Sequence, residues 1–276
     1  MGFATKVAHC LADPVFYRKS FYELLRNFRQ FKEAPLMISQ GDLKSIKRAL
    51  VVVAHPDDET FCSGIISALK ANRSDVTVIC VTRGEGGPTG GAKREDLASI
   101  REREMMAACK ALSVDQVFFL DHVDPVGGAY RVYAPDVSAD QLAAEISAHS
   151  DQVDLVISHG SSGEYWHAAH LLVYAAVRKM IGAKGKESPP WITFFARDTD
   201  HLLPHLLNED DEADLRIDCT AFHSHRLEAL NSHQSQLGLF RRFAGGTSDD
   251  FVKMTSLESY CVQSGEVGCI TNRETD

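Results

Sequence analysis

Short runs of apolar, β-branched residues alternate with longer segments of helical periodicity from about residue 49 onward. This alternation is typical of βαβ units, in which helices connect parallel strands. The strands are predicted at 49–54, 76–82, 117–121, 154–159 and 191–196. The helices are predicted at 61–72, 95–112, 138–149 and 168–181. The pattern therefore predicts an α/β fold, a Rossmann-like, mostly parallel sheet with helices on both faces.

The last third of the chain is less regular than the part before it. Its acidic stretch "NEDDEAD" at 208–214 is predicted to be a loop, followed by a strand over "LRIDCT". A helix is predicted near 222–237 from its spacing of apolar residues.

The first 46 residues differ in character from the rest. The segment "FYRKSFYELLRNFRQFK" at 16–32 carries aromatic and leucine residues at helical spacing, with arginine and lysine on the opposite face. We therefore divide the chain into an amphipathic helical N-terminal extension at 1–46 and an α/β domain at 47–276. The apolar face of the extension is expected to pack on the domain, and the alternative is that residues 16–32 lie on a membrane surface or on a partner.

Composition narrows the class of protein. The 276 residues are 44% hydrophobic and 24% charged, which is typical of a globular chain able to bury a large core. The formal net charge of −9 argues against general nucleic-acid binding, since the chain as a whole repels phosphate backbones. Because no run approaches about 18 consecutive apolar residues, no transmembrane segment is predicted.

The cysteines indicate a reducing compartment. There are 7 of them, an odd number, widely scattered and never spaced as Cys-x-x-Cys. This pattern argues against a disulfide framework and against a cysteine zinc site. A cytoplasmic location is therefore expected.

The stretch "AHPDDE" at 54–59 places a histidine and three acids directly after a predicted strand. In an open α/β sheet the ligand crevice lies outside the carboxyl ends of the strands, so His55 is expected at its rim. The three acids could simply stabilise a helix N-terminus, where the dipole favours anions. A second cluster makes a catalytic role the better hypothesis.

That second cluster is "SSGEYWHAAH" at 161–170, which follows the strand predicted at 154–159. His167 and His170 are three residues apart, so a helix presents both on one side. Imidazole and carboxylate ligands together suit zinc or another first-row divalent metal. His55, Asp58 and one of the two later histidines would complete a set of three ligands.

The remaining groups of the two clusters suit metal-assisted hydrolysis. Asp57 could take a proton from the attacking water, and the histidine that does not bind metal, if protonated, could stabilise an oxyanion. His159 also follows a predicted strand, and it either lines the pocket or is an ordinary polar residue at its rim. Asp121, His122 and Asp124 follow another strand and could reach hydroxyl groups of a substrate, although their spacing does not require it.

These motifs resemble the PIG-L/LmbE-like zinc-dependent N-deacetylases. "AHPDDE" matches the first signature of that family, and "YWHAAH" at 165–170 keeps the tyrosine and both histidines of the second. Further similarity lies in "TRGEGG" at 82–87, "IREREMMAACKALSV" at 100–114 and "HRLEALNSHQSQ" at 225–236. The N-terminal extension is not covered by the resemblance.

The resemblance assigns a role to each matching residue. It implies that His55, Asp58 and His170 hold zinc or a similar divalent metal. It implies that Asp57 is the general base, that protonated His167 stabilises the tetrahedral intermediate, and that Tyr165 polarises the amide carbonyl. Arg101, which matches an arginine of the family, would bind hydroxyls or a phosphate of the substrate.

The chain departs from the family at Ala168 and Ala169, where the second signature usually has Pro-Asp. An aspartate at this point could orient or tune the neighbouring histidine. Either another carboxylate substitutes for it, or turnover is slower.

The function expected on these grounds is hydrolysis of an N-acetyl group from a 2-acetamido sugar within a glycoconjugate or biosynthetic intermediate. The implied partner is an N-acetylated amino-sugar substrate. One alternative is a catalytically weak relative that binds a sugar or a lipid-linked glycan, motivated by the missing aspartate and by the basic, aromatic helix predicted in the N-terminal extension. Another is a hydrolase of a non-sugar amide, because the metal chemistry requires only a carbonyl group.

Overall fold

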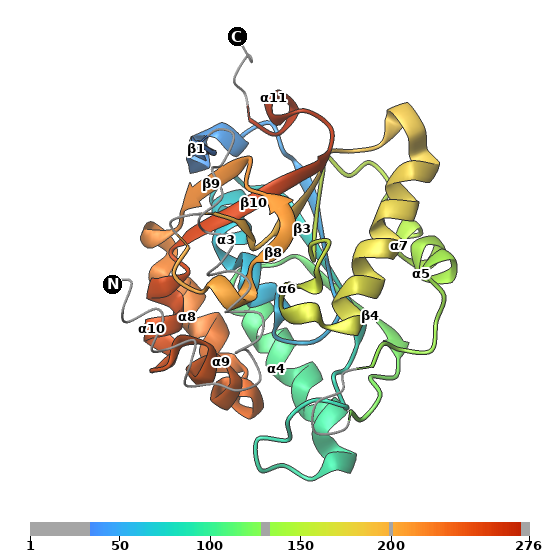
Figure 1. Ribbon diagram of the computed structural model, residues 1–276, viewed down its shortest axis with the longest axis vertical. Coiled ribbons are helices and arrows are strands. Elements are labelled where there is room, and N and C mark those ends of the chain that lie inside the picture. Colours follow the sequence, from blue (N-terminus) through green and yellow to red (C-terminus); the bar gives the residue numbers. More distant parts are fainter. Residues whose placement is uncertain (1–33, 128–132, 199–200, 272–276) are drawn as a thin grey trace.

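The computed structural model of the chain describes residues 34–127, 133–198 and 201–271. Its centre is an eight-stranded sheet with the strand order β1-β9-β10-β6-β5-β2-β3-β4, shown with its helices in Figure 1. The strands are β1 (Leu36–Ile38), β2 (Arg48–Val53), β3 (Asp75–Thr82), β4 (Gln116–His122), β5 (Leu155–Ser158), β6 (Trp191–Phe194), β9 (Leu215–Asp218) and β10 (Leu257–Ser264). A separate two-stranded sheet is formed by β7 (Ala196–Arg197) and β8 (Asn208–Glu212).

The sheet is largely parallel, as the sequence predicts. The neighbouring strands β4, β3, β2, β5 and β6 are parallel to one another, whereas β10 is antiparallel to both β6 and β9. From β2 the chain proceeds to β3 and β4 on one side and returns to β5 on the other. This reversal is the topological switch point beside which open α/β sheets bind their ligands.

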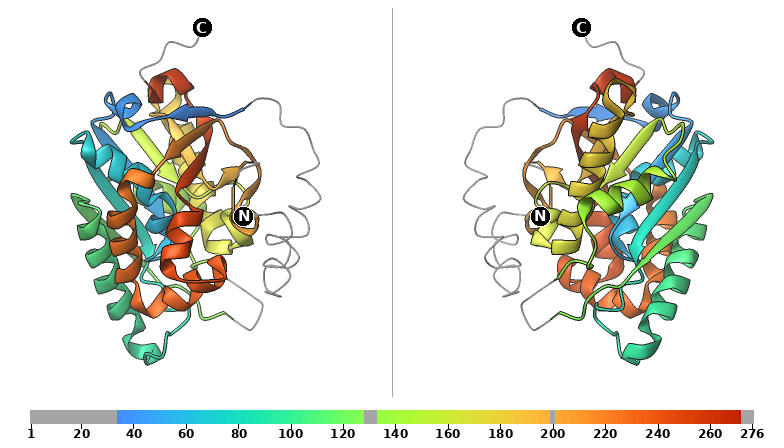
Figure 2. Two further views of the ribbon diagram at one scale, coloured as in Figure 1. Left: turned by 90° about the vertical axis from the view of Figure 1, so that its left-hand side faces the viewer. Right: turned by 90° about the vertical axis from the view of Figure 1, so that its right-hand side faces the viewer.

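Helices cover both faces of the sheet, as the fold class requires. They are α3 (Ser63–Ala71), α4 (Leu97–Ala111), α5 (Ala139–Ser147), α6 (Gly163–Trp166), α7 (Ala168–Lys184), α8 (His223–Ser232), α9 (Leu237–Ala244), α10 (Ser248–Met254) and α11 (Val267–Ile270). Helices α5 and α7 lie together on one side of the sheet in Figure 1, and both views of Figure 2 place α4 (green) beside α8 (orange).

The alternation of side chains along β2 explains why its whole run is apolar. Val51 and Val53 belong to the hydrophobic core with α3, α4 and α8, whereas Leu50 and Val52 belong to a second core with α5 and α7. Successive side chains of a strand point to opposite faces, so a strand covered on both sides needs apolar residues at every position.

Two sequence-based expectations are wrong in the last third of the chain. The acidic stretch at 208–214 is not entirely a loop, because β8 occupies Asn208–Glu212. Its inward side chains are polar and hydrogen-bonded: the amide N–H of Ser161 donates to Asp211 Oδ2 at 2.9 Å. The helix expected near 222–237 ends at Ser232, and a 3₁₀ turn at Gln234–Gln236 separates it from α9.

The predicted boundary between residues 46 and 47 also needs correction. Strand β1 pairs in parallel with β9, Leu36 lying opposite Leu215, so the main sheet already includes residues assigned to the extension. A strand this short has too few residues to show a pattern of its own. The amphipathic segment at 16–32 lies outside the described residues.

Two expectations about the chain as a whole concern membranes and thiols. No helix within the described ranges is both long enough and apolar enough to cross a bilayer. The cysteines in those same ranges are free thiols. The cytoplasmic location stays a prediction.

Candidate active site

The two histidine-bearing motifs meet at the carboxyl ends of two adjacent strands. Strands β2 and β5 are paired in parallel, with Val51 opposite Ile157. The first motif follows β2 and the second follows β5, so both leave the sheet at the same edge. The predicted convergence of the motifs is confirmed.

Asp57 has an unusual backbone conformation, with φ at 113°. Non-glycine residues rarely adopt positive φ, and such strain costs on the order of 1–3 kcal/mol. Glu59 holds it in place, because the Asp57 N–H donates to Glu59 Oε2 at 3.0 Å. Glu59 Oε1 in turn lies 2.5 Å from His233 Nε2, and both side chains are fully buried. The third acid of the motif therefore supports Asp57 instead of capping a helix.

Asp58 is buried among three imidazole rings. Its carboxylate accepts the backbone N–H of His55 at 2.8 Å and lies 3.2 Å from His55 Nδ1. The Nε2 atoms of His159 and His170 each lie 3.4 Å from it. Burial by itself would raise the pKa of Asp58, but the imidazoles of His170 and His159 outweigh burial and hold the pKa well below its usual value.

Two buried imidazole nitrogens in this cluster fit a metal ion. His55 Nε2 and His170 Nε2 have no hydrogen-bond partner among the residues that the structure describes. Leaving buried polar atoms unpaired is unfavourable unless a ligand satisfies them. One set of ligand atoms lying within 4.8 Å of one another comes from His55, His167 and His170. The other comes from Asp58, His159 and His170.

The predicted ligands are thus close together but divided between these two sets. His55 belongs to the first, Asp58 to the second and His170 to both. Neutral imidazole and carboxylate donors are the ligands that zinc and similar divalent ions prefer. The residues present therefore fit a divalent metal, while the individual assignment of His55, Asp58 and His170 stays a prediction.

Arg101 lies directly against Asp57. Its Nη2 atom is 3.0 Å from Asp57 Oδ2 and donates to the carbonyl oxygen of Pro56 at 2.5 Å, while Nη1 donates to the carbonyl of Gly84 at 2.7 Å. A side chain at Gly84 would collide with the guanidinium, since its Cβ would lie 2.3 Å from Nη1. The geometry makes Arg101 a support for Asp57, and its contact with substrate stays a prediction.

The environment of Asp57 raises the pKa of its carboxyl to about 6. Burial is the largest cause, Arg101 opposes it, and the charge of Asp58 adds to it. A carboxylate with a raised pKa is a stronger base than an ordinary aspartate, as proton abstraction requires.

The surroundings of His167 disfavour the protonated form that the resemblance implies. It caps α7, and its Nδ1 atom accepts the backbone N–H of Ala169 at 3.3 Å. Burial and the neighbouring imidazoles of His170 and His55 hold the pKa of His167 well below 6.5. Within the described ranges no carboxylate is hydrogen-bonded to it. These surroundings favour the neutral ring, and the hydrogen bond to Nδ1 then leaves the proton on Nε2; the role of His167 stays a prediction.

Tyr165 lies beside the histidines, as the motif implies. Its ring centroid is 5.7 Å from that of His167 and 5.4 Å from that of His170. Burial, with the charges of Asp58 and Asp57, raises the pKa of its hydroxyl well above 10. The hydroxyl thus keeps its proton and can act as a donor, and its role toward a carbonyl stays a prediction.

Sequence reasoning missed or left open several residues that the fold brings to the cluster. Asp124 Oδ1 lies 3.5 Å from His55 Nε2, and its Oδ2 accepts the Gly86 N–H at 3.1 Å. Asp124 follows β4, and its position after a strand was the only signal. Glu59 and His233 are far apart in sequence and have no local pattern in common.

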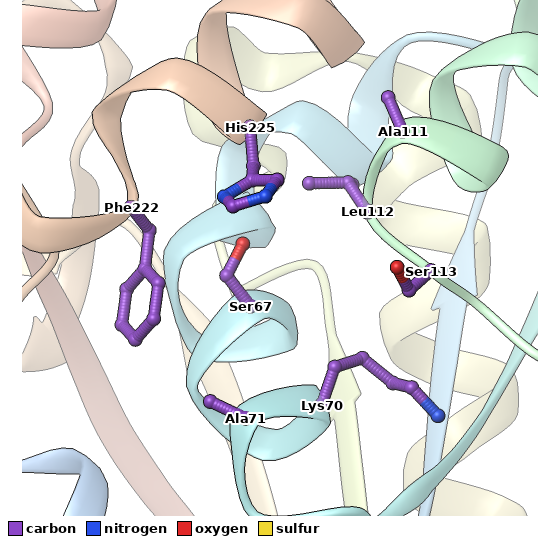
Figure 3. Close-up of a pocket in the computed structure, with 8 residues that line it drawn as sticks. All are labelled: Ser67, Lys70, Ala71, Ala111, Leu112, Ser113, Phe222 and His225. Carbon is purple, nitrogen blue, oxygen red and sulfur yellow. The ribbon is translucent and has the colours of Figure 1, made fainter.

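A pocket of 260 Å³ lies elsewhere, between α3, the end of α4 and the start of α8 (Figure 3). Ser67, Lys70, Leu112 and His225 are among its lining residues, and none of the candidate site residues lines it. The Lys70 ammonium is 2.5 Å from Asp115 Oδ2, so its charge is already paired. We assign this pocket no role in the chemistry.

Residues 50–181 match the family described as PIG-L, GlcNAc-PI de-N-acetylase. The chain carries a PIG-L family domain. The match begins in β2, ends in α7 and therefore contains both histidine-bearing motifs. The resemblance inferred from those motifs is confirmed.

A curated relative of the PIG-L domain is the 1D-myo-inositol 2-acetamido-2-deoxy-alpha-D-glucopyranoside deacetylase of Mycolicibacterium gilvum. The two chains are 26% identical over 267 residues, covering 80% of this chain and 92% of the relative. The likeness thus extends over nearly the whole length of that deacetylase.

Solved structures share the fold of the PIG-L domain at low sequence identity. The N,N'-diacetylchitobiose deacetylase of Pyrococcus horikoshii has a TM-score of 0.56 at 16% identity, covering 90% of this chain and 92% of that one. GalB, the 4-carboxy-2-hydroxymuconate hydratase of Pseudomonas putida, has a TM-score of 0.57 at 21% identity, covering 80% and 98%. Since a deacetylase and a hydratase share this fold, the fold alone does not decide the reaction.

Proposed function

We propose that this protein is a metal-dependent amide hydrolase that removes the acetyl group from the nitrogen of a 2-acetamido sugar. The observation that carries the proposal is the cluster around Asp58. The buried Nε2 atoms of His55 and His170 have no hydrogen-bond partner among the described residues, and both rings contact the Asp58 carboxylate. Asp57, the neighbouring residue, is held separately by Arg101.

His55, Asp58 and His170 would hold the metal, for which we propose zinc. When bound, such an ion supplies Lewis-acid chemistry, polarising a carbonyl group and lowering the pKa of a water molecule. The protein contributes a dry, rigid site, since all three side chains are buried.

Asp57 acts as the base in this mechanism. Its carboxylate accepts a proton from the water that attacks the acetamide carbon, forming the new C–O bond. When the C–N bond breaks, Asp57 returns that proton to the departing amine nitrogen, and acetate and a free amine are released. Arg101 keeps the carboxylate in one orientation between the two transfers.

His167 supports the developing oxyanion in its neutral form. Because Nδ1 accepts the Ala169 N–H, the ring carries its proton on Nε2 and can donate it in a hydrogen bond. A neutral donor stabilises an oxyanion without the aspartate that this chain lacks. The amine is then protonated by Asp57 and not by His167.

The relatives support one class of substrate. The Mycolicibacterium gilvum deacetylase acts on a 2-acetamido-glucose joined to inositol, and the family description names a GlcNAc joined to phosphatidylinositol. These substrates share the 2-acetamido sugar and differ in the group attached to it. We therefore propose an N-acetylglucosamine conjugate as the substrate of this chain.

The proposed function predicts acetate release from N-acetylglucosamine conjugates. Protein stripped of metal and reloaded with zinc is incubated with a panel that includes inositol and phosphatidylinositol conjugates, and acetate is measured enzymatically. Release is expected only after metal is restored, because the attacking water has its ordinary high pKa when no ion is bound.

A simple N-acetylated amine without a sugar ring serves as the control substrate. Release from that control at the same rate as from the sugars would contradict the sugar specificity and indicate a hydrolase of another kind of amide. No release from any substrate, with one metal bound per chain, would contradict the enzymatic proposal and favour a glycan-binding role.

A second prediction tests the neutral donor at His167. Replacing His167 by alanine is expected to lower kcat by roughly 10²–10³-fold, which is the effect of removing one oxyanion donor. His167→Gln keeps a side-chain N–H, so its kcat should fall less than that of His167→Ala. Metal content is measured in parallel, and loss of metal from His167→Ala would instead make His167 a ligand.

A further inference from the structure

Glu164 is a buried carboxylate that the proposed mechanism does not use. It lies in the short turn α6, with φ at 55° and ψ at −89°, and its solvent exposure is 0%. A strained, buried, charged residue persists only where the surrounding structure holds it firmly. Its contacts therefore indicate what it does.

Four donors converge on this one carboxylate. Oε2 lies 2.9 Å from His159 Nδ1 and 2.5 Å from His170 Nδ1. Oε1 accepts the Gly160 N–H and the Asn208 side-chain amide, each at 3.1 Å. Asn208 Oδ1 also accepts the backbone N–H of Glu164 at 3.1 Å, so Asn208 fixes both ends of the residue.

Gly160 makes this arrangement sterically feasible. A Cβ atom at that position would lie 2.2 Å from the Asn208 amide. Asn208 comes from β8, in the stretch where the sequence suggested only an acidic loop. The carboxylate is thus fixed by groups that follow β5 and by a residue of the small sheet.

The hydrogen bonds to Nδ1 determine which nitrogen of each ring is free. With Nδ1–H donating to Glu164, the Nε2 atom carries the lone pair. His159 Nε2 accepts the backbone N–H of Ala54 at 3.1 Å, so its lone pair is already used. His170 Nε2 has no partner within the described residues and lies 3.4 Å from Asp58.

We propose that Glu164 is the positioning residue that presents His170 Nε2 to the metal, a role that rests on the proposed function. Its carboxylate fixes the tautomer of His170 and increases the basicity of the opposite nitrogen. His159 completes the support: its ring stacks on His170 with centroids 3.9 Å apart and an interplanar angle of 22°. Glu164 thus serves His170, whereas the aspartate missing at Ala169 would adjoin His167.

The proposal predicts weaker metal binding when Glu164 becomes glutamine. One end of an amide is a donor, and at this position it would face the N–H groups that the carboxylate accepts. Loss of such a support typically lowers metal affinity by roughly 10–100-fold. The zinc affinity of metal-free Glu164→Gln is compared with that of the unaltered protein by competition with a chromogenic chelator.

Cobalt(II) is used as a second probe, because its visible absorption reports the ligands around the ion independently of catalysis. The cobalt spectrum of Glu164→Gln is expected to differ from that of the unaltered protein. Glu164→Asp keeps the charge but shortens the side chain, and it should retain part of the affinity. Near-ultraviolet circular dichroism checks whether Glu164→Gln folds. If it does not fold, the zinc affinity of Glu164→Asp tests the proposal instead.

Glu258→Gln is the matched control. Glu258 is another buried carboxylate, which accepts the N–H groups of Gly64 and Ile65 at 2.7 and 2.9 Å and contacts none of the candidate ligands. The Glu258→Gln variant should bind zinc with the same affinity as the unaltered protein. Unchanged affinity and spectrum in Glu164→Gln, or an equal loss in Glu258→Gln, would overturn the role of Glu164. An unaltered protein that binds no metal would overturn the proposed function as well.

Discussion

Replacing Asp57 by asparagine is expected to lower kcat for acetate release by roughly 10²–10⁴-fold while leaving metal binding intact. Asparagine has the same shape and tolerates positive φ, so the strained backbone at 113° should be kept. It cannot accept a proton from the attacking water. The loss should therefore appear in kcat, with little change in KM.

The measurement is steady-state acetate release at saturating substrate, together with the metal content of each protein by atomic absorption. Asp58→Asn provides the comparison, because it removes the neighbouring carboxylate from the same motif. It should lose metal, whereas Asp57→Asn should not. Turnover by fully metal-loaded Asp57→Asn at the rate of the unaltered protein would remove Asp57 from the role of base.

Replacing His170 by alanine is expected to weaken zinc binding by about 100-fold or more. A zinc site of four ligands in a zinc-finger peptide is worth about 10–16 kcal/mol, so one ligand contributes roughly 3 kcal/mol. The substitution also removes the group that Glu164 and Asp58 both contact. Activity should return only in part when excess zinc is added.

Zinc affinity in this series is measured by chelator competition on metal-free protein. His225→Ala is the control, since His225 is exposed on α8 and makes none of the contacts described at the site. It should bind zinc like the unaltered protein. Stoichiometric zinc held with unchanged affinity by His170→Ala would remove His170 from the ligand set.

The central strands of the sheet could be predicted because their signal is local. In β2 every position from Ala49 to Val53 is apolar, and the structure buries alternate residues in two different cores. The signal is also local for His55, Asp57 and Asp58, which lie within four residues of one another. Their spacing and their place after a strand are enough to predict where they lie.

The strand β8 shows where the local signal fails. Its sequence, Asn208 to Glu212, has the polarity of a loop. Asn208 and Asp211 nevertheless point inward, because Glu164, Ser161 and Thr193 supply hydrogen bonds for them. A buried polar strand is stable only where such partners exist, and these come from distant parts of the chain.

By itself, the sequence determined the parallel sheet, the two motifs and the edge at which they meet, because each depends on periodicity or on strand order. Only the tertiary structure decided how the motif residues are supported. Glu59 with His233, Asp57 with Arg101, and Glu164 with Asn208 are pairs distant in sequence. The burial and the neighbouring rings that lower the pKa of His167 likewise come from the tertiary structure. Burial and hydrogen bonding depend on which segments pack together, and no local pattern encodes that.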